Sequence, residues 1–170
     1  RMEKDDIMVM TSQPSTGSLQ EAVQKIKDQG YSHVIGLPIA TGLSSTMNGM
    51  KLACDMLDMP VTLVDTKGTA SNHKYLIEVA AKLASEGKSP AEIKDILEKL
   101  VEDSATIIMV PNLDHLKKGG RITPAVATLA GLLKIVPVMK LNYDLGGKID
   151  SFAKVRTVKK ANLKIIEHMV

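Results

Sequence analysis

The segment from Thr41 to Thr46 brings four hydroxyl side chains and one glycine together within six residues. It follows a short apolar run, residues 32–39, and precedes apolar residues at helical spacing, so we expect it at a strand-to-helix junction. Hydroxyls and free amides at the start of a helix favour an anion such as a carboxylate or a phosphate. Alternatively, Ser44 or Ser45 simply caps the following helix, and the residues alone leave both interpretations open.

The same segment is a weak candidate for a nucleophilic serine. Gly42-Leu43-Ser44-Ser45-Thr46 lacks the second glycine of a nucleophile elbow. The four histidines are scattered, and none occupies a position that a motif would give to a catalytic base. The chain also has no Walker loop, Rossmann glycine fingerprint or paired-histidine zinc motif. We therefore expect no catalytic residue, no metal and no cofactor.

A second cluster, Lys117-Lys118-Gly119-Gly120-Arg121, places a guanidinium beside a glycine turn. The forked donors of arginine suit a carboxylate or a phosphate. The alternative is a basic loop with a glycine that ends a helix. These residues also leave both interpretations open.

Composition excludes several classes of protein. The chain has 170 residues, 44% of them apolar, and a net charge of +3, which is typical of a globular protein. No apolar run is long enough to span a membrane, the start has no secretory pattern, and the single Cys54 cannot form an internal disulfide, so we expect a cytoplasmic location. The helical spacing around Cys54 predicts that it lies in the core. Basic residues are interleaved with acids and aromatic residues are scarce, which disfavours nucleic-acid binding.

Helices and strands alternate in the first half, which predicts an α/β domain with a parallel sheet over residues 1–103. We expect a helix from a capping box, Ser18-Leu19-Gln20-Glu21, to about Gln29, helices over about 47–57 and 70–85, and strands at 32–39 and 61–65. A second capping box, Ser89-Pro90-Ala91-Glu92, predicts a helix to about Asp103. The ligand site should lie beyond the carboxyl ends of the strands, near residues 41–46 and 65–71.

The pattern changes in the second half, for which we expect a smaller α+β domain over residues 104–170. A strand at 105–110 is followed by a short helix from Asn112 and an apolar helix at 124–133. Strands at 135–142 and 149–156 flank Gly146-Gly147, a hairpin signal that predicts antiparallel pairing, and a helix follows from about Val158.

Four segments, read in order, resemble the motifs of the DegV family. They are Thr11-Ser12-Gln13-Pro14-Ser15, Thr41-Gly42-Leu43-Ser44-Ser45-Thr46, Val64-Asp65-Thr66-Lys67 and Lys118-Gly119-Gly120-Arg121-Ile122, against approximate family patterns TSQPS, SSGLSGT, VDSK and KGGRI. The similarity extends over essentially the whole chain. It implies two α/β domains that bind a long-chain fatty acid, whose carboxylate is presented to a fatty acid kinase that carries out the phosphoryl chemistry.

Matched to these motifs, Thr11 and Ser44 are the expected carboxylate contacts, and Arg121 is the arginine of the fourth motif. Ser12, Thr41 and Ser45 complete the expected ligand-binding set. Ser45 replaces a family glycine, so its amide can still donate while its side chain narrows the approach.

The resemblance also implies what surrounds the chain. Family members have an extra strand before the first motif and a histidine-containing segment after the last, so we expect a fragment shortened at both ends. The expected protein is a bacterial carrier, monomeric and without chemistry of its own. The alternatives are a phosphotransferase or hydrolase that uses the Thr41 to Thr46 loop, and an interaction module whose basic residues Lys154 to Lys160 bind an acidic partner.

Overall fold

The computed structural model describes residues 10–110, 113–127 and 135–169. Within these residues the chain forms two compact units. The larger unit comprises residues 13–106 and 141–147, and the smaller unit comprises the described parts of residues 1–12, 107–140 and 148–170. The two domains expected from the sequence, 1–103 and 104–170, are each continuous in the chain, whereas each unit draws on separate segments. The expected domain boundary stays a proposal.

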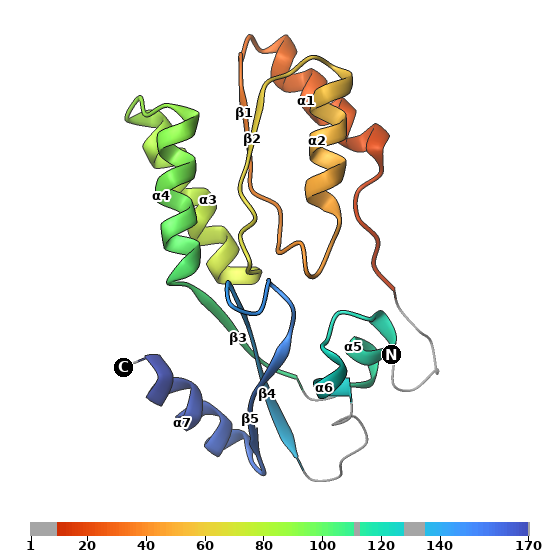
Figure 1. Ribbon diagram of the computed structural model, residues 1–170, viewed down its shortest axis with the longest axis vertical. Helices are drawn as coiled ribbons and strands as arrows, with labels where there is room; N and C mark the ends of the chain where they lie inside the picture. Colours follow the sequence, from red (N-terminus) through yellow and green to blue (C-terminus); the bar gives the residue numbers. More distant parts are fainter. Residues whose placement is uncertain (1–9, 111–112, 128–134, 170) are drawn as a thin grey trace. The chain divides into compact units, whose positions relative to one another are not determined.

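The larger unit is built around two parallel strands, β1 (Val34–Gly36) and β2 (Val61–Leu63), paired from Val34 with Val61 to Gly36 with Leu63. Figure 1 shows α1 (Thr16–Asp28) and α2 (Thr46–Met56) on one side of this pair, with α3 (Ala70–Ser85) and α4 (Pro90–Glu102) on the other. The expected parallel α/β architecture of the first half is confirmed.

Each side of the strand pair has its own apolar core. On the α1 and α2 side the buried residues are Val23, Ala53, Cys54 and Met59. On the α3 and α4 side they are Val64, Leu76, Ala80, Ile93, Leu97 and Val101. Successive residues of β1 serve opposite sides, because Val34 packs against the first core and Ile35 against the second. Cys54 lies in the core, as expected.

One of the two predicted capping boxes is confirmed and the other is wrong. At α4, the Ser89 side chain accepts from the Glu92 amide and the Glu92 side chain accepts from the Ser89 amide. At α1, the cap is Ser15 and not Ser18, and the Ser15 hydroxyl accepts from the Ser18 amide at 3.1 Å. Because Ser15 lies in extended conformation directly after Pro14, the helix starts one turn earlier than the Ser18 motif predicts.

The first strand is shorter than residues 32–39. Pro38 has no amide to donate to a neighbouring strand, so pairing ends at Gly36. The chain then continues as a loop to Ser45. This shortening lengthens the loop that carries the hydroxyl residues.

A second sheet has the order β3-β4-β5, with β3 (Ala105–Met109), β4 (Val136–Asn142) and β5 (Asp150–Val155). β3 and β4 each begin in one unit and end in the other. β4 and β5 are antiparallel, which confirms the predicted hairpin, and α7 (Val158–Met169) packs against β5 (Figure 1). At the hairpin tip Gly146 and Gly147 have φ angles of 61° and 71°, which favour glycine.

Two short helices complete the smaller unit. α5 (Asp114–Gly119) ends at Gly120, whose left-handed φ of 70° forms the predicted glycine turn. α6 (Pro124–Ala127) is the described part of the helix predicted at 124–133, and residues 128–133 of that prediction lie outside the described residues. Asn112, the predicted start of the first of these helices, also lies outside them. No helix in the described ranges is both long and apolar enough to cross a membrane.

Candidate functional site

The loops that follow β1 and β2 meet at one edge of the larger unit, because the two strands are parallel. Two hydrogen bonds tie the loops together outside the hydroxyl segment, and a third joins the first loop to α3. The Ala40 amide donates to the Gly68 carbonyl at 3.0 Å, and the Thr66 hydroxyl donates to the Pro38 carbonyl at 2.8 Å. The Nε2 atom of His73, at the start of α3, lies 2.6 Å from the Leu37 carbonyl oxygen. The backbone that leads to the hydroxyl segment is therefore fixed.

Asp65 joins the same two loops through its carboxylate. Its Oδ1 atom accepts from the amides of Thr41 and Lys67, both at 3.1 Å. Its Oδ2 atom accepts from the Thr41 hydroxyl and from the Lys67 ammonium, the latter at 2.7 Å. Partial burial raises the pKa of this carboxyl, but the four donors from Lys67 and Thr41 outweigh it and leave the pKa below its usual value. Asp65 is thus an ionised anchor for the loop.

Ser44 and Ser45 occupy the turn into α2. Ser45 is the residue that caps the helix, yet its side chain makes no capping hydrogen bond. The Ser44 hydroxyl instead accepts from the Thr46 amide at 3.3 Å and lies 2.8 Å from the Thr46 hydroxyl. Ser44 thus makes the local side-chain contacts at the start of α2, while Ser45 occupies the cap position without a capping bond. That either serine binds an anion stays a prediction.

The start of α2 keeps donors for a ligand. Among the described residues, the amides of Ser45 and Met47 have no hydrogen-bond partner. The first turn of the helix carries no acidic side chain, so nothing in it offsets the positive end of the helix dipole. Hydroxyls and amides at this turn can together donate hydrogen bonds to a bound carboxylate.

The other predicted site residues belong to the smaller unit. Thr11 and Ser12 are exposed, and the Arg121 side chain donates from Nη1 to the Gly119 carbonyl across the glycine turn. Beside it, Thr123 donates from its amide to the Ile149 carbonyl at 3.0 Å and from its hydroxyl to Asp150 at 2.8 Å. The structure brings Thr41, Ser44 and Ser45 together in one loop. That Thr11, Ser12 and Arg121 contact the same ligand stays a prediction.

Sequence reasoning gave no role to Asp65 or to Gly147. Asp65 was recognised only as part of a motif at a strand end, although a carboxylate directly after a buried strand is a usable signal. Gly147 lies at the hairpin tip, where an added Cβ would lie 2.7 Å from the Ala40 Cβ and 3.3 Å from the Lys67 Cα. The tip therefore packs directly on the loop that holds the hydroxyls.

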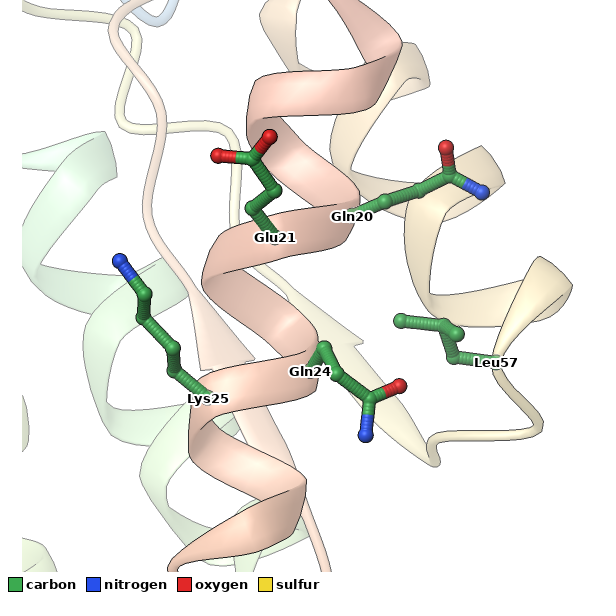
Figure 2. A pocket seen from close by; sticks show the side chains of 5 residues that line it. All are labelled: Gln20, Glu21, Gln24, Lys25 and Leu57. Carbon is green, nitrogen blue, oxygen red and sulfur yellow. The ribbon is translucent and has the colours of Figure 1, made fainter.

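A hollow of about 450 Å³ lies elsewhere on the larger unit. It is lined by Gln20, Glu21, Gln24, Lys25 and Leu57. Figure 2 shows the Gln20 and Gln24 side chains extending from α1 on the side where Leu57 lies. Leu57 follows the last residue of α2, whereas Ser45 precedes the first, so the hollow and the hydroxyl loop lie at opposite ends of that helix. The hollow is widely open to solvent and is not part of the loop site.

Comparison with known proteins gives consistent matches over this fold. The model of a family described as "uncharacterised protein, DegV family" matches residues 1–170. A DegV domain-containing protein of Streptococcus pneumoniae is 33% identical over 168 residues, which cover 98% of this chain and 59% of that protein. The chain thus spans about three fifths of the length of this relative.

Solved structures match equally well. A fatty acid binding DegV family protein from Streptococcus agalactiae superposes with a TM-score of 0.82 at 32% identity, covering 94% of this chain and 56% of that one. A stearic acid-binding protein from Eubacterium ventriosum superposes with a TM-score of 0.84 at 26% identity, covering 99% of this chain and 58% of that one. Both are described as binding a fatty acid.

Proposed function

Because this chain belongs to the DegV family, we propose that it binds a long-chain fatty acid and acts as a carrier for it. The observation that carries the proposal is the Thr41 to Thr46 loop, which ends at a helix start with unpaired amides and is held in place by Asp65. The names of the structural neighbours, which state fatty acid binding, support the same ligand class.

The chemistry of the loop suits a carboxylate. An ionised carboxylate that leaves water needs several donors, and neutral hydroxyls and amides can supply them without a full countercharge. We propose that Ser44 and the Ser45 amide contact the acid, and that Thr41 lies beside them in the same loop. A role for Thr11, Ser12 and Arg121 in ligand binding is proposed from the sequence motifs alone. The side chain of Ser45 narrows the approach where the family pattern has glycine.

The apolar tail supplies most of the affinity. At about 0.8 kcal/mol per buried methylene, a sixteen-carbon chain offers on the order of 11 kcal/mol before the ordering costs of binding are subtracted. The carboxylate contacts then fix the orientation of the ligand. When the tail supplies the affinity and the carboxylate contacts supply the orientation, the head group can lie at an accessible edge of the protein.

We further propose that the carrier presents this head group to a fatty acid kinase in the bacterial cytoplasm, and that it does so as a monomer. The phosphoryl transfer would then be the work of the partner.

Native mass spectrometry of the full-length protein purified from bacteria tests the proposal, followed by extraction and identification of any bound species. We expect one long-chain fatty acid per protein monomer. A protein that retains no fatty acid and binds none when it is supplied would overturn the proposal. Turnover of an acyl or phosphoryl substrate by the purified protein alone would favour the phosphotransferase or hydrolase alternative.

A variant with Thr11→Ala and Ser44→Ala tests the proposed carboxylate contacts. We expect fatty acid affinity to fall on the order of tenfold or more, since two hydrogen bonds to a charged group are lost. Lys51→Ala, on the exposed surface of α2, is a suitable control because, within the part of the chain that the structure describes, the Lys51 side chain pairs only with Asp55. Unchanged affinity of the double variant would remove both residues from the site.

A further inference from the structure

The Asp65 carboxylate accepts hydrogen bonds from both loops at this edge of the larger unit. All four of its hydrogen bonds come from Thr41, on the first loop, and Lys67, on the second. Thr41 is the first residue of the segment that leads to Ser44. The two hydrogen bonds from Thr41 to Asp65 therefore fix the start of the hydroxyl loop. Both members of the ion pair are largely enclosed, with 15% of the Asp65 side chain and 23% of the Lys67 side chain exposed.

The backbone of Lys67 is held in an uncommon conformation by the same carboxylate. Its φ angle is 46°, in the left-handed region that costs a residue with a Cβ about 1 kcal/mol or more. The hydrogen bond from the Lys67 amide to Asp65 stabilises this turn. The ammonium is consequently directed back onto the carboxylate at 2.7 Å.

The charges of this pair cancel next to the proposed carboxylate site. Alone, a partly buried Asp65 would repel an incoming carboxylate, whereas a free Lys67 would attract any anion. Paired, they leave the neutral hydroxyls and amides at the start of α2 to recognise the ligand.

We propose that Asp65 is a positioning residue for carboxylate binding, which fixes the hydroxyl loop through Thr41 and neutralises Lys67 beside the site. This inference rests on the proposed fatty acid function. It predicts that the pair controls the preference for an acid over a neutral lipid of the same length. The preference should therefore change in opposite directions when either charge is removed alone.

The test compares three variants of the full-length protein, Asp65→Asn, Lys67→Met and the double variant. Affinities for palmitic acid and for hexadecanol are measured by displacement of a fluorescent fatty acid. We expect the preference for the acid to fall on the order of tenfold in Lys67→Met, because the Asp65 charge beside Thr41 is then no longer neutralised. It should rise in Asp65→Asn, where Lys67 is unpaired, and return to within about threefold of the wild type in the double variant.

Asp55→Asn is the matched control. Asp55 and Lys51 form an ion pair of similar length, 2.8 Å, on α2, but their side chains are 54% and 62% exposed. This variant should leave both affinities unchanged. A purely structural role of Asp65 would weaken binding of the acid and the alcohol equally, so an unchanged preference in all three variants overturns the inference. Failure of the wild type to bind palmitic acid would instead overturn the proposed function.

Discussion

Gly147 lies so close to Ala40 that a Cβ on the glycine would lie 2.7 Å from the alanine Cβ. Its neighbour Gly146 also has a positive φ angle, 61° against 71°, yet nothing lies within 4 Å of the position that its Cβ would occupy. A substitution at Gly146 therefore tests backbone strain alone, whereas the same substitution at Gly147 tests backbone strain and close packing together. The packing is against the loop that leads to the proposed carboxylate site.

Gly147→Ala is expected to destabilise the protein more than Gly146→Ala. Each substitution costs about 1 kcal/mol from the left-handed conformation, and Gly147→Ala adds a clash that backbone or a neighbouring methyl must relieve, for a total of about 2–4 kcal/mol. Chemical denaturation measures both free energies of unfolding. Equal losses for the two variants would mean that the tip and the loop are not packed as described.

Ser45→Gly restores the residue of the family pattern and should be nearly neutral for stability. The Ser45 side chain makes no capping hydrogen bond, and glycine is acceptable at this position, so the change in unfolding free energy should stay within about 0.5 kcal/mol. Fatty acid affinity should be retained or improved, because the approach to the amide widens. A marked loss of affinity would show that the Ser45 hydroxyl itself binds the ligand.

The helix caps give a prediction with a built-in comparison. Ser89→Ala and Ser15→Ala should each cost about 1 kcal/mol, because each removes the side chain that accepts from the first turn of its helix. Ser18→Ala should cost less than about 0.5 kcal/mol, since among the described residues its hydroxyl hydrogen-bonds only to the hydroxyl of Ser15. Thermal or chemical unfolding of the three variants checks the order. A larger loss for Ser18→Ala would restore the sequence-based choice of cap.

These caps also show how far the sequence predicts the structure. The Ser89 box was predictable because all its contacts lie within four residues, with Pro90 at a favourable position. The Ser18 box has the same pattern and was wrong. It requires the Ser18 amide to donate to the Glu21 side chain, whereas in the structure this amide donates to the Ser15 hydroxyl, and the pattern alone does not rank Ser15 and Ser18 as caps. The place of the hydroxyl loop followed from the rule for parallel strands.

The role of Asp65 could not be predicted in this way. Its bonds to Thr41 join residues 24 positions apart, and they depend on the register of β1 against β2. The contact of Gly147 with Ala40 depends in turn on where the hairpin tip lies within the larger unit. Such relationships require the tertiary structure, whereas the motifs only identify which residues take part.

Cys54 should be unreactive in the folded protein. Burial raises the pKa of its thiol, with a smaller contribution from the nearby Asp55 carboxylate, and the side chain lies in the core between α1 and α2. Reaction with a thiol reagent should be at least about a hundredfold slower in buffer than in denaturant, because it requires local opening. The labelling rate is measured by absorbance. Rapid labelling of the native protein would contradict the packing of this core.

The final prediction concerns acid stability and follows from the pKa of Asp65. Its carboxyl has a lower pKa in the folded protein than its usual value, because the donors from Lys67 and Thr41 favour the ionised form. A lowered folded pKa contributes stability that is fully present above the unfolded pKa and is lost as the pH falls through the folded pKa. The free energy of unfolding of the wild type should therefore exceed that of Asp65→Asn by less and less as the pH falls from about 5 towards about 2.

Urea unfolding of both proteins at a series of pH values measures this difference. Glu92 also has a lowered pKa, through its hydrogen bonds with Ser89, but it is present in both proteins, so its contribution cancels. Asp55→Asn is the control, since it removes a carboxylate whose ion pair with Lys51 is exposed on α2. A constant difference between wild type and Asp65→Asn across this range would mean that the Asp65 carboxylate is not held by the donors of the two loops.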